Sequence, residues 1–431
     1  MADTLIKICR TFEEISAALS RSQLGYEEIN SAVREIVRSV KTRGDAALSE
    51  YTRKFDGIDL KAENSEVTQK EIDDAEKQVS KGLKAALKNA ARNIKIYQSK
   101  LMRGIAANAA KSFDKKTGVG YIVRPVSRAG IYVPGGKAPY PSSVLMCAVT
   151  AKAAGVKEIV MCTPAGRGVH PLILTAARFC GVDRVFKIGG AQAVAAMAYS
   201  TATVPKCDVI VGPGNIYVTL AKKEIYGEAG IDMLAGPSEI LIIADETADP
   251  RFLAADMLSQ AEHDELASAF LVTTSEALAE KVVSELEFAL DKLPRKGIAK
   301  KAIRNNSAVI IAGSLEKAFE ISNKIAPEHL ELCIKEPEKQ LASVLNAGAV
   351  FLGNYTPEPV GDYYAGSNHV LPTSGAARYA SGLSVENFIK KISVDNYSRE
   401  MLLKAKDDII ALAETEEFHA HANAVKVRFD R

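Results

Sequence analysis

Polar and apolar positions follow two different patterns along the chain. In the first part, charged residues predominate and apolar side chains recur at steps of three and four, as at Leu83, Leu87 and Ala90. This spacing predicts amphipathic helices. Thr68 and Glu71 have the spacing of a capping box, which predicts the start of a helix. We expect these helices to give structural support rather than chemistry.

The second pattern is an alternation of short all-apolar runs with helix-like segments. In residues 116–236 the runs are GIYV, EIVMC, RVF and VIV, and in residues 237–385 they are EILIIA, AFLVTT, AVII and AVFL. Repeated strand–turn–helix units predict parallel sheets in a doubly wound α/β fold. Strands that are apolar throughout predict helices on both faces of each sheet.

These patterns divide the chain into four regions. We expect a helical region over 1–115, which packs largely on the second α/β domain. The first α/β domain occupies 116–236 and the second occupies 237–385. Residues 386–431 have a helical pattern, which predicts a C-terminal helical tail.

Composition and charge exclude several classes of partner. Of the 431 residues, 47% are hydrophobic and 25% are charged, and the formal net charge is only +2. That balance gives no general attraction to nucleic acid or to an anionic membrane. No apolar run reaches the roughly 18 residues of a membrane span, and the start lacks the apolar core of a secretion signal. We therefore expect a cytoplasmic protein.

Six cysteines are scattered along the chain, and none forms a Cys-x-x-Cys pair. Several lie within apolar runs, such as Cys147 in SVLMCAV and Cys162 in IVMCT. This setting predicts buried, reduced thiols, as in a cytoplasmic protein.

Glycine turns at 134–136, 189–190 and 212–214 end successive strands of the first α/β series. Open α/β sheets bind ligands at this carboxyl edge. Neither nucleotide fingerprint is met, because Tyr217 stands where a third glycine is needed and Ala138 replaces the Ser or Thr of a P-loop. No acid follows EIVMCTPAG to hold a ribose. Simple tight turns are an equally good interpretation of each turn.

Polar outliers in the second series point to a metal site. The stretch Gly353–Thr373 has few aliphatic residues, many turn formers and a central Asp362, and such loops commonly serve a site. Gln260 and His263 are three residues apart on a helix expected over 249–268, so they share a face. Histidine and carboxylate side chains are typical zinc ligands. Taken alone, however, each feature also fits an ordinary loop or a packed helix.

Two further pairs carry proton-transfer or ligand groups. Glu328 and His329 are adjacent bases with ordinary pKa values near 4.3 and 6.5, which suits a reaction with two distinct proton transfers. Glu416 and His421 lie near the C-terminus. Solvated surface pairs are the alternative interpretation.

Together these stretches resemble the L-histidinol dehydrogenase family. The resemblance extends over residues from about 120 to 425 and rests on motifs that are specific only in combination. The matching stretches are RPVSRAGIYVPGGKAPYPSSVLM, GGAQAVAAMAYST, VGPGNIYVTLAKK, DMLAGPSEILIIAD, LSQAEHD, IAPEHLEL, TPEPVGDYYAGSNHVLPT and AHANAV.

The resemblance implies two incomplete Rossmann-like parallel-sheet domains with helical N- and C-terminal extensions. It implies one zinc ion per subunit, with ligands at Gln260, His263, Asp362 and His421. The implied catalytic bases are Glu328 and His329, and the implied NAD+ contacts are Tyr132, Gln192 and Asn215. The implied substrate contacts are Ser238, Gln260, His263, His329, Asp362, Glu416 and His421. His419 is an additional histidine beside the ligand position, but the five-residue spacing from Glu416 favours His421.

The family chemistry is the last step of histidine biosynthesis. L-Histidinol is oxidised through bound L-histidinal to L-histidine, with two NAD+ and with His329 and Glu328 acting as separate bases. The resemblance also implies a homodimer in which the C-terminal tail reaches the partner's site, bringing Glu416 and His421 from the other subunit.

Two other functions are possible. A cysteine-dependent aldehyde dehydrogenase-like enzyme would use Cys147 or Cys162 as nucleophile, and that requires an accessible thiol with a depressed pKa. A non-enzymatic α/β ligand-binding protein of the periplasmic type would have a signal peptide and no metal. The sequence favours neither.

Overall fold

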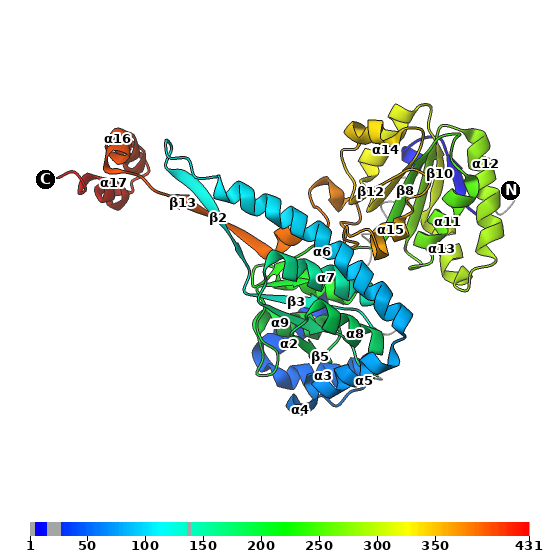
Figure 1. The fold of residues 1–431 in the computed structure, drawn as a ribbon, viewed down its shortest axis with the longest axis horizontal. Coiled ribbons are helices and arrows are strands. Elements are labelled where there is room, and N and C mark those ends of the chain that lie inside the picture. The colour runs from blue at the N-terminus through cyan, green and yellow to red at the C-terminus, as the bar shows by residue number, and fades with distance from the viewer. Residues whose placement is uncertain (1–4, 15–26, 136–138, 167, 431) are drawn as a thin grey trace. The chain divides into compact units, whose positions relative to one another are not determined.

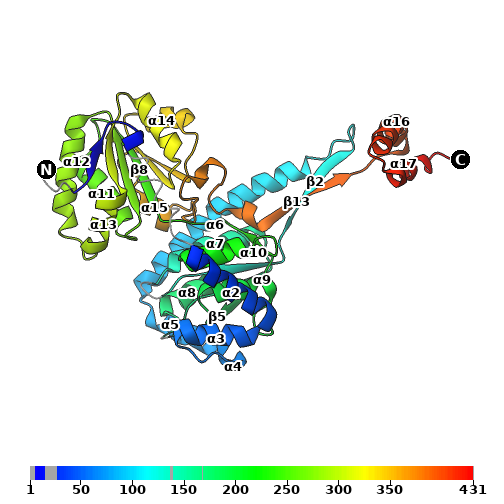
Figure 2. The ribbon, with the colours of Figure 1, turned by 180° about the vertical axis from the view of Figure 1, so that it is seen from behind.

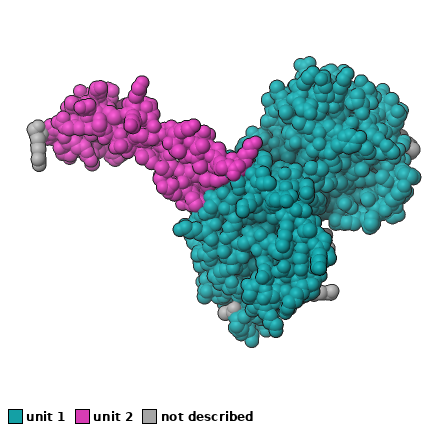
Figure 3. Space-filling view, in the orientation of Figure 1, with its two compact units in different colours: residues 1–99, 126–388 teal, residues 100–125, 389–431 magenta. Residues whose placement is uncertain are grey.

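The computed structural model describes residues 5–14, 27–135, 139–166 and 168–430. These fall into two compact units, of which unit 1 combines residues 1–99 with 126–388 and unit 2 combines 100–125 with 389–431 (Figure 3). Two parallel sheets and their helices form unit 1, so the predicted α/β class is confirmed (Figure 1). No helix within the described ranges is long and apolar enough to cross a membrane.

The first sheet contains five parallel strands in the order β5-β4-β3-β6-β7. Its central strands are almost entirely buried, as expected for a sheet with helices on both faces. The strands are β3 (Arg128–Tyr132), β4 (Glu158–Cys162), β5 (Arg184–Phe186), β6 (Val209–Val211) and β7 (Gly230–Ile231). The helices between them are α7 (Pro141–Ala154), α8 (Pro171–Cys180), α9 (Gly190–Tyr199) and α10 (Ile216–Ile225).

Helices α2 and α3 pack on this first sheet, so for these two helices the prediction that the N-terminal region packs largely on the second domain is wrong. Val33 and Val37 of α2 and Leu48 of α3 share one core with Val160 and with the alanine-rich helix α9 (Figure 2). The small side chains of α9 leave room for two further helices to approach closely. The helices of this region are α2 (Glu27–Arg43), α3 (Asp45–Asp56), α4 (Ala62–Ser65), α5 (Gln69–Gln78) and α6 (Lys81–Ala110).

The capping box predicted at Thr68 and Glu71 is confirmed. The Thr68 side chain accepts from the Glu71 backbone N–H, and the Glu71 carboxylate accepts from the Thr68 backbone N–H at 2.8 Å. It begins α5, and a break at Val79–Ser80 separates α5 from α6.

The second sheet contains six parallel strands in the order β1-β10-β9-β8-β11-β12. The strands are β1 (Lys7–Cys9), β8 (Glu239–Ala244), β9 (Ser268–Thr273), β10 (Ala308–Ile311), β11 (His329–Cys333) and β12 (Ala349–Leu352). The α-helices are α11 (Pro250–Ala261), α12 (Glu276–Leu290), α13 (Lys296–Asn306), α14 (Leu315–Ile325) and α15 (Glu358–Tyr363). Short 3₁₀ turns occupy Pro337–Ser343, Ala376–Arg378 and Val385–Phe388.

Unit 2 joins two segments that are distant in sequence. Strands β2 (Val119–Pro125) and β13 (Ile389–Asp395) form an antiparallel ladder, followed by helices α16 (Arg399–Thr415) and α17 (His419–Lys426). The C-terminal tail therefore begins with a strand rather than a helix, and β2 is not part of the first sheet. Pairing between remote strands leaves no local signal in the sequence pattern. The predicted domain boundaries at 236/237 and 385/386 stay predictions.

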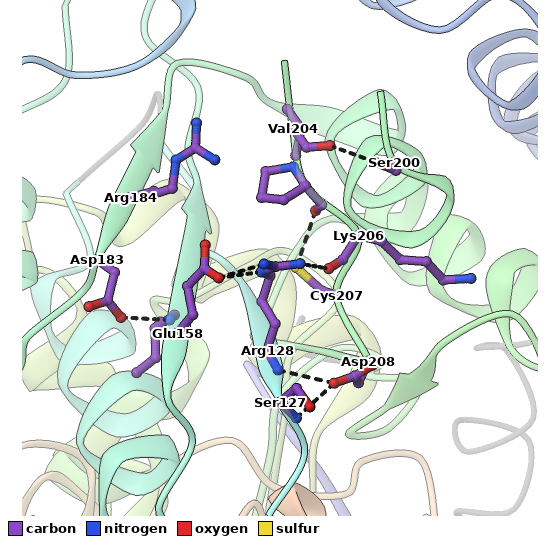
Figure 4. Close-up of polar contacts among 12 residues, drawn as sticks. Ser127, Arg128, Glu158, Asp183, Arg184, Ser200, Val204, Lys206, Cys207 and Asp208 are labelled. Carbon is purple, nitrogen blue, oxygen red and sulfur yellow. Dashed lines mark hydrogen bonds and ion pairs between the residues drawn. The ribbon is translucent and has the colours of Figure 1, made fainter. Parts of the chain in front are cut away.

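A polar network ties together the amino ends of the strands in the first sheet (Figure 4). Arg128 Nε donates to Glu158 Oε2 at 2.7 Å, and Arg128 Nη1 donates to the Lys206 carbonyl at 2.7 Å. Asp208 Oδ2 accepts from the backbone N–H groups of Ser127 and Arg128 at 2.8 and 3.0 Å. These contacts join β3, β4 and the segment before β6, so this edge of the sheet is held by paired groups.

Candidate active site

Gln260 and His263 lie at the end of α11. The helix ends at Ala261 instead of continuing to residue 268 as expected, because Ser268 already begins β9. Gln260 Nε2 and His263 Nδ1 are nevertheless 3.1 Å apart, so the two side chains meet. Gln260 is fully buried, and its Oε1 has no hydrogen-bond partner among the described residues. An unsatisfied buried acceptor beside an imidazole fits a metal ligand pair.

The stretch Gly353–Thr373 adds two carboxylates to this pair. Glu358 and Asp362 are four residues apart on the short helix α15, so they share a face. One ligand atom from each of His263, Glu358 and Asp362 lies within 4.8 Å of the others. A nitrogen and two carboxylate oxygens at this spacing form a donor set that suits a divalent ion such as zinc.

The loop that carries Asp362 is fixed by its own polar contacts. Asn368 Nδ2 donates to the Met146 carbonyl at 3.0 Å, while its Oδ1 accepts from the Val370 backbone N–H at 2.9 Å. His369 Nδ1 lies 3.1 Å from the Asp362 carbonyl oxygen. The Asn–His pair of the loop therefore orders the segment around Asp362.

The charge states of these groups also suit a metal. Burial acts to raise the pKa of Asp362, but the imidazoles of His329, His369 and His263 outweigh it, and the pKa is lowered. The His263 side chain is exposed at the surface, yet the protein packed around the ring lowers its pKa. A carboxylate and a neutral imidazole are the forms that coordinate cations.

The two predicted bases are held by the main chain of one residue. Glu328 Oε2 accepts from the Glu239 backbone N–H at 2.9 Å, and His329 Nδ1 lies 2.9 Å from the Glu239 carbonyl oxygen. A carbonyl only accepts, so Nδ1 of His329 carries the proton and donates, which leaves the lone pair on Nε2 when the ring is neutral. His329 Nε2 lies 3.7 Å from Asp362 Oδ1 and 4.0 Å from Glu358 Oε1. It is buried without a hydrogen-bond partner among the described residues.

Both bases have strongly shifted pKa values. Burial raises the pKa of Glu328 to about 8, partly offset by the neighbouring imidazole. Burial alone would lower the pKa of His329, but the carboxylates of Glu328, Asp362 and Glu358 outweigh it and raise the pKa to about 10. Two adjacent buried bases with displaced pKa values are characteristic of acid–base catalysis.

Two residues of this site, Glu239 and Glu358, were missed by the sequence interpretation. Glu239 is the first residue of β8, where burial raises the pKa of its carboxyl to about 7. Glu358 is buried, and Ser259 Oγ donates to its Oε2 at 3.0 Å. The one signal for Glu358 was its position four residues before Asp362; Glu239 gave none beyond following Ser238.

The remaining predicted substrate contacts lie in different places. Ser238 directly precedes β8, is half-buried, and accepts from the Ser268 backbone N–H at 3.1 Å through its carbonyl. Glu416 follows the last residue of α16, and His421 lies within α17, as does His419. Glu416 and His421 belong to unit 2, whereas Gln260, His263, His329 and Asp362 belong to unit 1. Their share in the site stays a prediction.

The predicted nucleotide contacts gather at the carboxyl edge of the first sheet. Tyr132 ends β3, and its hydroxyl oxygen accepts from the Gly190 backbone N–H at 3.0 Å, so it joins two of the predicted turns. Gln192 is 1% exposed, and both of its amide atoms lack partners among the described residues. Asn215 caps α10, accepting from Tyr217 N at 3.1 Å through Oδ1. Buried amide atoms without partners fit a ligand-binding role.

The third turn, 212–214, is fixed by a buried ion pair. Lys222 Nζ donates to the Gly212 carbonyl at 3.0 Å, and Asp232 Oδ2 accepts from the Gly212 backbone N–H at 2.8 Å. Lys222 and Asp232 also pair with each other, with side chains 3% and 0% exposed. A Cβ on Gly212 would lie 2.2 Å from the Tyr132 carbonyl oxygen, so only glycine fits there. The last residue of the first turn, Gly136, lies outside the described residues, as do Lys137 and Ala138 after it.

The six cysteines are buried and free, as predicted. Cys147 and Cys162 are fully buried, and burial raises the pKa of both thiols. A nucleophilic cysteine needs access and a lowered pKa. The structure therefore argues against the cysteine-dependent alternative.

Fold and site together define an α/β oxidoreductase. Its glycine turns lie at the edge of one sheet, and its buried Glu328–His329 pair lies on the other, beside the imidazole and carboxylates of the His263, Glu358 and Asp362 cluster. The family model described as histidinol dehydrogenase matches residues 19–429. The chain belongs to the histidinol dehydrogenase family.

Similar proteins support this assignment over nearly the whole length. The histidinol dehydrogenase of Bacillus cereus (strain ATCC 14579) is 50% identical over 428 residues, covering 97% of this chain and 98% of that protein. The histidinol dehydrogenase of Caldanaerobacter subterraneus subsp. tengcongensis is 52% identical over 413 residues, covering 95% of each chain. The crystal structure of histidinol dehydrogenase from Elizabethkingia anophelis matches with a TM-score of 0.90 and 39% identity, covering 99% of this chain and 98% of that one.

Proposed function

We propose that the chain is a zinc- and NAD-dependent histidinol dehydrogenase that oxidises L-histidinol through bound L-histidinal to L-histidine. The observation that carries the proposal is the position of His329 Nε2. This buried base has no hydrogen-bond partner among the described residues and lies 3.7 Å from Asp362, in the carboxylate–imidazole cluster. Oxidation of an alcohol that is held by a metal ion requires a base close to the metal ligands, and His329 Nε2 has that position.

The proposed zinc ligands in unit 1 are Gln260, His263 and Asp362. Their donor types and the unsatisfied Oε1 of Gln260 support this role. When bound, zinc would orient the amine and imidazole of histidinol, without a redox role of its own. Glu358 contributes a further carboxylate at the same place. Binding of a cation by Asp362 would neutralise a charge that raises the pKa of His329, so its imidazole could be neutral and act as a base.

The two bases serve different steps. His329 Nε2 accepts the hydroxyl proton while the carbinol carbon loses a hydride, which produces the aldehyde. Glu328 then removes a proton from the water that attacks the aldehyde carbon. The hydrate would lose a second hydride while His329 accepts a hydroxyl proton, and the carboxylic acid formed releases its remaining proton to give the carboxylate. Two NAD+ accept the two hydrides. Glu239 positions both bases through its main chain, so their separation is fixed during both steps.

We further propose that the enzyme is a cytoplasmic homodimer with shared sites, in which Glu416 and His421 of one chain complete the site of the other. Mixing inactive His263→Ala and His421→Ala chains under conditions of subunit exchange tests this. If the ligands come from different chains, each mixed dimer contains one intact site and activity returns. Confirmed exchange with no recovered activity would mean that the tail serves its own subunit.

The function itself is tested by measuring bound zinc together with the NADH formed per histidinol consumed. We expect one zinc ion per chain and two NADH per histidinol, with histidine as product. One NADH per histidinol with released aldehyde, or full turnover in chains without a metal, would contradict the proposal.

A further inference from the structure

The carboxyl edge of the first sheet contains an acid that no sequence motif predicted. Asp56 is the last residue of α3, far from the glycine turns in sequence. A Cβ placed on Gly189 would lie 3.2 Å from Asp56 Oδ2, and a Cβ on Gly166 would lie 3.0 Å from the Asp56 carbonyl oxygen. Asp56 therefore lies against the segments that follow β4 and β5.

This position matters because of the strand order. The order β5-β4-β3-β6-β7 corresponds to strands 3-2-1-4-5 of the dinucleotide-binding fold, with β3 as its first strand and β4 as its second. In that fold, an acid at the end of the second strand binds the hydroxyls of the adenosine ribose. The residues after β4, from Thr163 to Gly166, contain no acid. Asp56, which comes from outside the motif, lies against Gly166 at the end of this segment.

The surroundings of Asp56 are not those of a structural acid. It lies at the C-terminus of α3, where the helix dipole disfavours a carboxylate, and Gly57 already caps that helix by donating to the Arg53 carbonyl. Its Oδ2 is buried without a hydrogen-bond partner among the described residues. Burial raises the pKa of the carboxyl, and the nearby Gly189 backbone N–H, which makes no hydrogen bond to Oδ2, only partly offsets this. An acceptor in this state is available to a hydroxyl donor.

A second unsatisfied group lies at the same turn. Gln192 is in the first turn of α9, almost fully buried, and neither of its amide atoms has a partner among the described residues. A Cβ on Gly190 would lie 2.8 Å from Gln192 Oε1. Asp56 and Gln192 thus lie beside consecutive glycines at the start of one helix, and the Tyr132 hydroxyl lies beside the second glycine.

We infer that Asp56 binds the ribose hydroxyls of the adenosine half of NAD+, replacing the acid that the second strand lacks. The inference rests on the proposed NAD+ dependence and adds a residue that selects the cofactor. A carboxylate at this place accepts from the 2′-hydroxyl and repels a 2′-phosphate, so the chain uses NAD+ in preference to NADP+.

The test measures NADH affinity by fluorescence titration rather than turnover. Hydrogen bonds to a charged group contribute enough that Asp56→Asn should weaken NADH binding about tenfold to a hundredfold. Asp59→Asn is the matched control, because Asp59 is an exposed acid three residues further on, paired with Arg53. The control should bind NADH as the unaltered chain does, and both variants should keep bound zinc and histidinol affinity.

A hydroxyl-specific comparison excludes a merely structural role. The 2′-deoxyadenosine analogue of NADH should bind the unaltered chain as weakly as it binds Asp56→Asn, and NADPH should gain relative affinity in Asp56→Asn. The analogue comparison on the unaltered chain needs no variant to fold. If NADH and its deoxy analogue bind the unaltered chain equally, or lose the same factor on substitution, Asp56 is not the ribose ligand. An unaltered chain that binds no NADH contradicts both this inference and the proposed function.

Discussion

The two sheets of unit 1 carry polar groups of different kinds at opposite edges. At the carboxyl edge of the five-stranded sheet, the groups near Tyr132 and Gln192 are neutral hydroxyls, amides and backbone N–H groups apart from the single acid Asp56, and the charges of Lys222 and Asp232 are paired with each other. At the amino edge of the six-stranded sheet, His329 and Glu239 begin neighbouring strands, close to Glu328 and Asp362. Neutral donors and acceptors suit ligand binding, whereas dense coupled charges suit proton transfer.

The proposed use of an amino edge as the reaction site departs from the usual rule for open α/β sheets, whose ligands bind at the carboxyl edge. The departure arises because β8 and β11 begin, rather than end, with the reactive residues. The proposed nucleotide site on the first sheet follows the rule, and the amino edge of that sheet is closed by the Arg128–Glu158 network (Figure 4). Under the proposed function, unsatisfied buried groups, more than topology alone, mark the edge that binds ligands.

The largest effect should follow loss of a metal ligand near His329, at the amino edge of the six-stranded sheet. Asp362→Ala or His263→Ala removes a donor from the three-residue cluster, so we expect activity and tightly bound zinc to be abolished while the fold survives. Metal analysis, turnover and thermal unfolding would be measured together. Asp264→Asn, an exposed neighbour that keeps its acceptor for Leu266 N, is the control. Retention of tightly held zinc with normal turnover in either variant would remove these residues from the metal site.

The second prediction separates the roles of the two bases, Glu328 and His329. A positioned general base contributes about 10²–10⁴-fold. Glu328→Gln should mainly prevent hydration of the aldehyde and affect the first hydride step less, whereas His329→Asn should slow both proton-coupled hydride steps. Single-turnover reactions started from histidinol and from histidinal resolve these steps. Equal damage by Glu328→Gln to the first hydride transfer and to the whole reaction would show that the pair acts as one unit.

The smallest effect concerns stability and pH. Burial raises the pKa of Asp256 to about 6, so folding binds a proton that the unfolded chain releases near pH 4. Stability therefore falls as pH rises from about 4 to 6, and the loss persists above that range. Asp256→Asn removes the buried charge. Above pH 6 it should raise the free energy of unfolding by about 1–2 kcal/mol, after allowance for partial exposure, and below pH 4 it should leave this free energy unchanged.

A comparison with Gln192, at the carboxyl edge of the five-stranded sheet, sharpens this prediction. Gln192→Met removes two unpartnered polar atoms without removing a charge, so any gain in stability should be the same at every pH. Urea unfolding of both variants at pH 4 and pH 7.5 makes the comparison. A pH-independent change in Asp256→Asn would show that the charge of Asp256 does not lower the stability of the fold.

The sequence predicted those parts of the structure that depend on local pattern. The apolar strands of both sheets and the capping box at Thr68 follow directly from periodicity and end signals. Of the site, Gln260, His263, Glu328, His329 and Asp362 were found because unlike polar residues interrupt apolar or turn-rich stretches, and the resemblance assigned their roles.

What the sequence did not predict depends on contacts between remote segments. Glu239 looks like an ordinary acid at a strand start, and only the fold brings its main chain to Glu328 and His329. Asp56 belongs to a helix that was predicted to pack on the other domain. Packing partners are chosen by tertiary shape, which a single amphipathic stripe does not specify.

The β2–β13 ladder has a consequence for the synthesis of the chain on the ribosome. Residues of β2 pair one for one with β13, up to Pro125 with Ile389, so the partner of β2 is translated only after every strand of both parallel sheets. At about 5–20 residues per second, that delay is on the order of 10–50 s. Throughout it, a nascent chain presents an open strand edge bearing Val119 and Ile122, which are exposed even in the finished unit. Chains interrupted before residue 389 would keep that edge permanently, so stalled translation products should associate with one another through β2.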